Sequence, residues 1–130
     1  MSEQAPAITG IAALAVDCHD PPALAHWWSR LLGGEVEVDD DGDATLRTPG
    51  GLAVDFARVP ESKTVKNRLH LDLRADGTTR DEELDRLIAL GARRVDVGQG
   101  PDVSWVVLAD PEGNEFCLLQ RTVEEAQRND

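Results

Sequence analysis

The sequence predicts an α+β domain made of two copies of one strand–helix–three-strand unit. An amphipathic helix pattern occurs once in each half, strand patterns flank it, and glycine-containing turns recur at corresponding places. A length of 130 residues suits one domain and is too short for two ordinary ones. We therefore expect a single domain over 1–130, with modules at about 8–60 and 68–120.

The first half opens with a strand predicted at 8–18, where large and small apolar residues alternate. Asp20 is a typical helix N-cap, and the two prolines after it fit a first helical turn. Gly33-Gly34 ends this helix. Its apolar face, at helical spacing, comprises Leu24, Trp27, Trp28, Leu31 and Leu32. The strands that follow are predicted at 36–38, 45–47 and 52–59, with turns at Asp41-Gly42 and Pro49-Gly50-Gly51.

The same order restarts after a polar segment over 60–67, which carries both lysines of the chain. Leu69, Leu71 and Leu73 alternate with polar residues, which predicts a half-buried strand. Thr79 and Glu82 have the spacing of a capping box at the start of the second helix. The remaining strands are predicted around Val95 and Val97, at 105–108 and at 115–120, followed by a polar tail.

Composition excludes several classes of partner. The formal net charge is −12, which disfavours binding to nucleic acids and to anionic membrane surfaces. No apolar run approaches the length of a membrane-spanning helix, and the first six residues lack the apolar core of a signal peptide. Cys18 and Cys117 are the two cysteines, and we expect free thiols in a cytoplasmic protein.

Several short motifs follow one another in a fixed order within 8–120. They are Asp20-Pro21, Trp27-Trp28, Leu31-Leu32-Gly33-Gly34, the run from Lys66 to Leu73, Leu90-Gly91-Ala92 and the run from Asp110 to Phe116. In this order and spacing the chain resembles the vicinal oxygen chelate superfamily, and within it the glyoxalase-like domain proteins. The resemblance implies two βαβββ modules in one curled, eight-stranded sheet around a cup-shaped pocket, and it implies a homodimer. Members include metalloenzymes and binding proteins, so the fold alone does not select a function.

The resemblance also implies where a metal would bind, because metalloenzymes of that superfamily place ligands on the first and last strands of each module. Those positions here are Ala13, Asp55, His70 and Cys117. His70 matches the family's histidine, Ala13 has no donor atom, and Cys117 stands where glutamate is usual. We therefore expect no full glyoxalase metal site, although His70, Asp55 and Cys117 could in principle bind zinc.

A second group of candidates follows from strand alternation. His70, Asp72 and Arg74 project from one face of the predicted fifth strand. This trio could orient an anionic or hydroxylated ligand, or it could form an internal salt-bridge ladder, and both interpretations stay open. Trp105, on a predicted inner strand, is a further candidate for ligand contact. The predicted ligand-binding set is His70, Asp72, Arg74, Asp55, Trp105 and Cys117.

The predicted function is the binding of a small molecule in the cup-shaped pocket, without a resident cofactor. The alternative is a lyase or isomerase of glyoxalase type that uses a divalent metal at His70, Asp55 and Cys117. A dioxygenase is a weaker third hypothesis, because the two-histidine, one-carboxylate set is absent at these positions. No catalytic residue is assigned.

Overall fold

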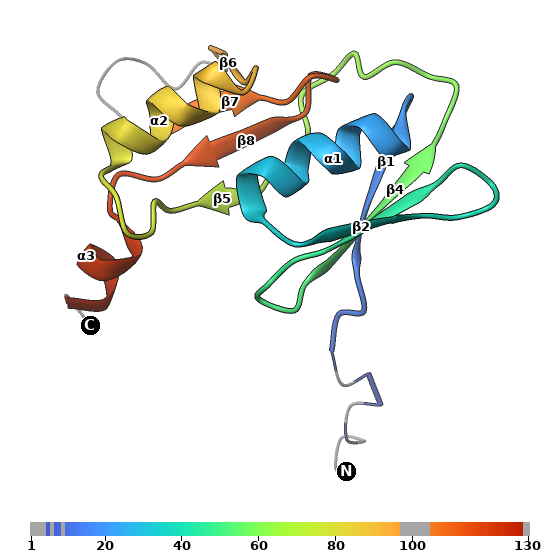
Figure 1. Cartoon of the computed structure of the whole chain (residues 1–130), viewed down its shortest axis with the longest axis horizontal. Coiled ribbons are helices and arrows are strands. Elements are labelled where there is room, and N and C mark those ends of the chain that lie inside the picture. Colours follow the sequence, from blue (N-terminus) through green and yellow to red (C-terminus); the bar gives the residue numbers. More distant parts are fainter. Residues whose placement is uncertain (1–4, 6, 9, 97–104, 129–130) are drawn as a thin grey trace, which may run out of the picture. The chain divides into compact units, whose positions relative to one another are not determined.

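The computed structural model describes residues 5, 7–8, 10–96 and 105–128. The chain divides into two compact units, a first unit at Met1–Val59 and a second unit at Pro60–Asp130. Each contains a four-stranded mixed sheet and a helix that joins its first two strands (Figure 1). The α+β class and the doubled unit are therefore confirmed. The eight predicted strands are found as two sheets of four.

The first unit contains β1 (Leu14–Cys18), α1 (Pro21–Leu32), β2 (Glu35–Val38), β3 (Ala44–Arg47) and β4 (Ala53–Arg58). Its strand order is β1-β4-β3-β2, with β1 parallel to β4 and the other pairs antiparallel. Helix α1 packs against β2, β3 and β4. The predicted apolar helix face is confirmed by burial, and the side chains that fill this core include Leu24, Trp27, Trp28, Leu46 and Phe56.

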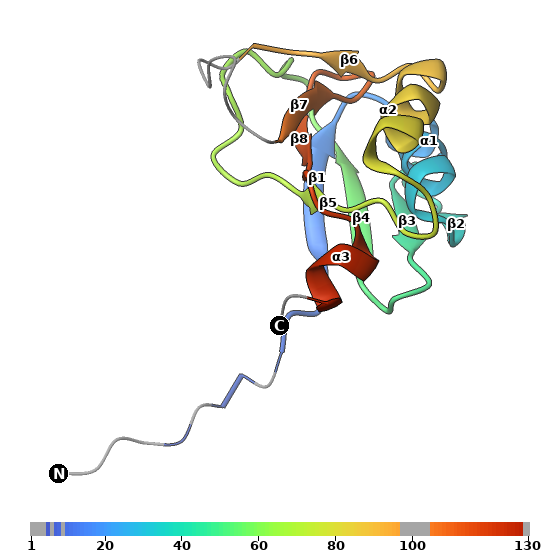
Figure 2. The same ribbon diagram turned by 90° about the vertical axis from the view of Figure 1, so that its left-hand side faces the viewer.

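The second unit contains β5 (Asp72–Leu73), α2 (Arg80–Ala89), β6 (Arg93–Arg94), β7 (Val106–Ala109), β8 (Glu115–Leu118) and α3 (Val123–Arg128). Its strand order is β5-β8-β7-β6, with β5 parallel to β8. Helix α2 runs alongside this sheet in both ribbon views (Figures 1 and 2). Its core side chains include Leu87, Leu108, Phe116 and Leu118.

Both predicted N-caps are confirmed. The Asp20 carboxylate accepts a hydrogen bond from the backbone N–H of Ala23 at 3.2 Å, which caps α1. The Thr79 hydroxyl accepts one from the backbone N–H of Glu82 at 3.1 Å, which caps α2. Each bond satisfies a donor that the first turn of a helix leaves without a partner.

Three hairpin turns share one five-residue geometry. In each, the first residue's N–H donates to the carbonyl of the fifth, and a glycine N–H at the fourth position donates back to the first. The glycines have positive φ angles of 88° to 100°, which a side chain would disfavour. These turns begin at Asp39, Thr48 and Asp110 and join β2 to β3, β3 to β4 and β7 to β8.

Three strand predictions are wrong at their ends. Strand β1 begins at Leu14, opposite Val54 near the start of β4, and not at the predicted residue 8. Leu69 is 84% exposed rather than half-buried, since it lies before β5, which begins at Asp72. Strand β6 is Arg93–Arg94, although the Val95 N–H still donates to the carbonyl of Val107. Val97, also predicted in this strand, lies outside the described residues.

None of the helices in the described part of the chain is long and apolar enough to span a membrane.

Candidate functional site

The candidate site begins with the short parallel pairing of β5 and β8. Asp72 and Cys117 are direct partners across this pair. The N–H groups of Cys117 and Leu119 donate to the carbonyls of Leu71 and Leu73 at 2.9 and 2.8 Å. Because partners on neighbouring strands point to the same face of a sheet, Asp72 and Cys117 present their side chains together.

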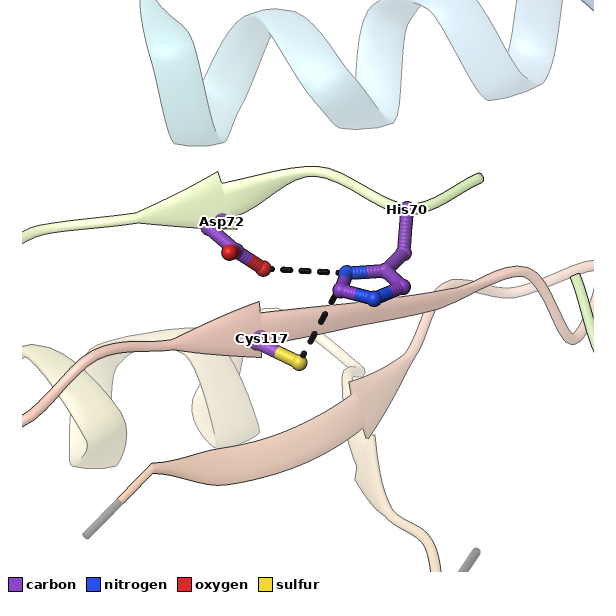
Figure 3. A group of neighbouring side chains, drawn as sticks. All are labelled: His70, Asp72 and Cys117. Atoms are coloured by element: carbon purple, nitrogen blue, oxygen red, sulfur yellow. Dashed lines mark hydrogen bonds and ion pairs between the residues drawn. The ribbon is translucent and has the colours of Figure 1, made fainter. Parts of the chain in front are cut away.

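His70 completes a cluster of three side chains (Figure 3). Its Nδ1 lies 2.9 Å from an Asp72 carboxylate oxygen and 4.0 Å from the Cys117 Sγ. Donor atoms of the three residues lie within 4.8 Å of one another. The His70 and Asp72 side chains are 38% and 47% exposed, whereas Cys117 is buried. The cluster therefore combines a base, an acid and a thiol at a surface that solvent reaches.

The surroundings of Cys117 keep its thiol protonated. Burial raises the pKa of the Cys117 thiol, the Asp72 carboxylate raises it further by charge and by a hydrogen bond, and the Lys66 ammonium opposes them weakly. The imidazole also turns the same nitrogen to Asp72 and to the thiol, whereas a catalytic relay uses one nitrogen for each. Neither observation favours Cys117 as an activated nucleophile.

The segment over 60–67, predicted to be a simple connector, is fastened to the same strand. The Glu115 carboxylate accepts from the Lys63 ammonium and from the backbone N–H of Asn67, both at 2.9 Å. The Asn67 amide also donates to the Asn114 side chain at 3.4 Å. Sequence reasoning missed this anchor, although the placement of both lysines in one short segment of an acidic chain was a usable signal.

This ion pair predicts a pH-dependent contribution to stability. Burial alone would raise the pKa of Glu115, but the Asn67 N–H and the Lys63 ammonium outweigh it, so the pKa lies below its usual value. Glu115→Gln should lower the free energy of unfolding by about 1–2 kcal/mol at pH 7. A group with a lowered folded-state pKa stabilises fully above its ordinary pKa, and this contribution disappears as the pH falls through the folded-state value.

Urea denaturation between pH 7 and pH 3 measures this effect. The gap between the wild type and Glu115→Gln should narrow as the solution is acidified. Glu61→Gln, at an exposed position of the same segment, should stay close to the wild type throughout. A Glu115→Gln gap that is constant or widens at low pH would contradict the assignment.

The remaining predicted site residues lie apart from the cluster or beside it. The Arg74 guanidinium donates to the carbonyl of Arg121 at 3.0 Å. Trp105 is 40% exposed and lies two residues before Val107, the β7 partner of Cys117, so alternation places it toward the same face. Asp55 belongs to the first unit, where its carboxylate accepts from the Thr45 hydroxyl at 2.7 Å.

A separate cleft of about 500 Å³ lies between the first turns of α2 and α3. Its hydroxyl groups are used structurally, since Thr79 caps α2 and Thr122 exchanges hydrogen bonds with Glu125. The carboxylates that line it include those of Asp81 and Glu82. These features are typical of solvated helix ends, and they assign the cleft no ligand.

The donor atoms of the cluster determine which metal ion it could hold. An imidazole nitrogen, one carboxylate and a thiol form a mixed N, O, S donor set. Such a set suits zinc, which accepts all three donor types in tetrahedral sites. It does not suit manganese or magnesium, which prefer several oxygen ligands. The donor set therefore fits a zinc-like ion and does not fit an oxygen-rich centre.

Comparison with known proteins agrees with this fold. FosX, the fosfomycin resistance protein of Listeria monocytogenes, crystallised with Mn(II) and sulfate, is 17% identical over 94% of this chain and 98% of its own, with a TM-score of 0.67. FosX from Mesorhizobium loti is 14% identical over 93% and 98%, with a TM-score of 0.67. The oxidase ChaP-H2 is 18% identical over 87% and 94%, with a TM-score of 0.61.

No curated protein has a significantly similar sequence. The profile of the glyoxalase-like domain matches residues 13–119, which include β1 to β8 and the helices α1 and α2 of the described residues. The structural neighbours carry the same vicinal oxygen chelate fold. The chain is therefore a member of the glyoxalase-like domain family.

Proposed function

We propose that the protein binds a small polar molecule through the cluster of His70, Asp72 and Cys117. The observation that carries this proposal is the exposed His70–Asp72 hydrogen bond beside a buried thiol. An imidazole and a carboxylate together offer a donor and an acceptor to a hydroxylated or anionic ligand. Arg74, directly after β5, and Trp105, directly before β7, are proposed as further contacts.

Charge supports an anionic or hydroxylated ligand at this place. The chain as a whole is strongly acidic, yet the Lys66 ammonium acts on Cys117, and Arg74 follows β5. Local positive charge in a negative protein favours an anionic group on a bound molecule. The FosX structure crystallised with (1S,2S)-dihydroxypropylphosphonic acid shows that this fold can hold a ligand of that class.

A thermal-shift screen of small hydroxylated and anionic compounds, with (1S,2S)-dihydroxypropylphosphonic acid as a defined probe, tests the proposal. At least one compound should raise the melting temperature of the wild type. His70→Ala and Asp72→Asn should each weaken its binding about 10- to 100-fold, because each removes a hydrogen bond that involves a charged group. His26→Ala, on the exposed side of α1, is the matched control and should bind normally.

Two results would count against the proposal. One is a screen in which no compound stabilises the wild type. The other is a compound that stabilises the wild type, His70→Ala and Asp72→Asn equally, because such a compound binds elsewhere.

A lyase or isomerase of glyoxalase type is a second candidate, favoured by the three donor atoms within 4.8 Å of one another. A metal there would act as a Lewis acid toward a substrate with adjacent oxygens. The protein's own part would be to orient that substrate with His70 and Asp72. Conversion of a substrate by metal-loaded protein, and no conversion by His70→Ala, would distinguish this candidate from simple binding.

We also propose that the protein works as a homodimer in the cytoplasm. Val65 and Leu69 are 76% and 84% exposed, and a contact with a second copy of the chain would cover them. Both cysteines remain thiols, as expected from the sequence, and this state suits a reducing compartment. Light scattering on the wild type and on Leu69→Lys measures the oligomeric state.

A further inference from the structure

We propose that His70, Asp72 and Cys117 form a binding site for a zinc-like divalent cation, complete within the second unit. The inference shares its residues with the proposed function but does not depend on the ligand. It differs from the set implied by the family resemblance in its carboxylate, which is Asp72 rather than Asp55. The Cys117 sulfur, which both sets contain, makes the site selective for zinc-like ions.

Backbone geometry gives the first argument. The hydrogen-bonded pairing of β5 and β8 holds Asp72 and Cys117 side by side. A tetrahedral zinc site separates its ligand atoms by roughly 3.3–3.6 Å, from bond lengths of about 2.0–2.3 Å. The observed separations of 2.9 Å from Nδ1 to the carboxylate and 4.0 Å from Nδ1 to Sγ lie on either side of this range. All three donor atoms lie within 4.8 Å of one another, so small side-chain rotations would bring them to ligand distance.

Exposure gives the second argument. Cys117 is buried at the bottom of the cluster, whereas the His70 and Asp72 side chains are 38% and 47% exposed. An ion held by all three would sit on the sheet face with its fourth position toward solvent. Three protein ligands and one open position are typical of zinc sites that bind a further molecule.

The charges of the ligands and the preference of a thiolate for zinc give the third argument. When the cation binds, the Cys117 S–H bond breaks, the proton passes to solvent, and the sulfur takes up the metal. The thiolate and the Asp72 carboxylate then balance both positive charges of the ion, with His70 neutral. A thiolate favours zinc, and manganese is the weakest of the common first-row ions for such a set. This preference sets the site apart from the Mn(II)-bound FosX structures.

The identity of the carboxylate can be tested directly. Asp72 is the strand partner of Cys117 and already contacts His70. The carboxylate of Asp55 is engaged by the Thr45 hydroxyl at 2.7 Å within the first unit. Asp72→Asn should therefore weaken zinc binding, whereas Asp55→Asn should leave it unchanged.

The experiment uses full-length protein that has been stripped of metal with a chelator. Calorimetry measures Zn²⁺ and Mn²⁺ affinity, and absorption with Co²⁺ reports a sulfur-to-metal charge-transfer band. The wild type should bind one Zn²⁺, at least about 100-fold more tightly than Mn²⁺. Cys117→Ser should lose the charge-transfer band and about 100-fold or more in Zn²⁺ affinity, beyond what loss of an outer-shell partner usually costs. His70→Ala should have a similar effect.

The matched control for Cys117→Ser is Cys18→Ser, at the buried cysteine of the first unit, which should keep both the band and the affinity. Circular dichroism confirms that each variant is folded, and the exposed Asp72→Asn gives an independent result if Cys117→Ser unfolds. Three results would each overturn the inference. They are a charge-transfer band that survives in Cys117→Ser, equal affinity of the wild type for Mn²⁺ and Zn²⁺, and loss of Zn²⁺ binding in Asp55→Asn.

Failure here is distinguishable from failure of the proposed function. Ligand stabilisation of metal-free protein, without zinc binding, would remove the metal site and leave the binding function. Zinc binding to the cluster, without any stabilising compound, would do the reverse.

Discussion

Replacing Gly34 with alanine is expected to lower the free energy of unfolding by about 2–5 kcal/mol. Gly34 follows α1 with a φ of +95°, a conformation that costs a side chain about 1–2 kcal/mol. An added Cβ would also lie 2.1 Å from the carbonyl oxygen of Arg47 and 3.1 Å from the Cα of Thr48. Both are backbone atoms at the end of β3, so the clash can be relieved only by moving the sheet, at a further cost of about 1–3 kcal/mol.

Gly42→Ala is the matched control. Gly42 has a similar φ of +88°, but an added Cβ there would meet nothing within 4 Å. The free energy of unfolding of Gly42→Ala should therefore fall only by the cost of a positive φ for a side chain, about 1–2 kcal/mol. Urea denaturation followed by the fluorescence of Trp27 and Trp28, which are buried in the same unit, measures both variants. If the free energy of unfolding fell equally in both variants, the close approach of Gly34 to β3 would have no energetic effect.

Replacing Asp110 with alanine is expected to cost about 3 kcal/mol and to loosen the hairpin that presents Cys117. The Asp110 side chain is fully buried. Its carboxylate accepts from the backbone N–H groups of Glu112 and Asn114, both at 2.9 Å, and from the Asn114 amide at 3.0 Å. Alanine would leave part-buried donors without partners, and each such loss costs about 1–3 kcal/mol.

The β2–β3 turn supplies the comparison. The Asp39 carboxylate accepts from the N–H groups of Asp41 and Asp43 at 2.9 and 3.0 Å, which is the same pattern at an exposed position. Water can replace these bonds, so Asp39→Ala should cost only about 0.5–1 kcal/mol. Chemical denaturation of the two variants measures how much each substitution destabilises the protein. Because both carboxylates accept from two backbone N–H groups in the same pattern, a difference reports the effect of burial. If Asp39→Ala were as damaging as Asp110→Ala, burial would not be the cause.

Fold prediction succeeded where one face of an element is buried. The apolar face of α1 and the caps at Asp20 and Thr79 have direct sequence signals, and the structure confirms them. It failed at strand ends, where pairing and not side-chain pattern sets the limit. Arg93 and Arg94 form β6 although both are exposed, because the edge of a sheet needs only backbone hydrogen bonds.

The site was predictable in part for the same reason. Alternation placed His70 and Asp72 on one face, and the structure brings them into contact. The pairing of Asp72 with Cys117 depends on the register of β5 and β8, and a sequence does not specify register across the 44 intervening positions. The tie from Lys63 and Asn67 to Glu115 is also long-range, and the two lysines in one short segment mark one end of it without indicating the partner.

That tie limits how the chain can change in length between its two units. From Asn67 onward the backbone is fixed to β8 through Glu115, only three residues before His70. Extra residues inserted between Lys63 and His70 would have to break this attachment or displace the imidazole. Extra residues inserted at Pro60–Ser62 precede it and leave the cluster in register. Natural or engineered variation in linker length should therefore be confined to these few positions.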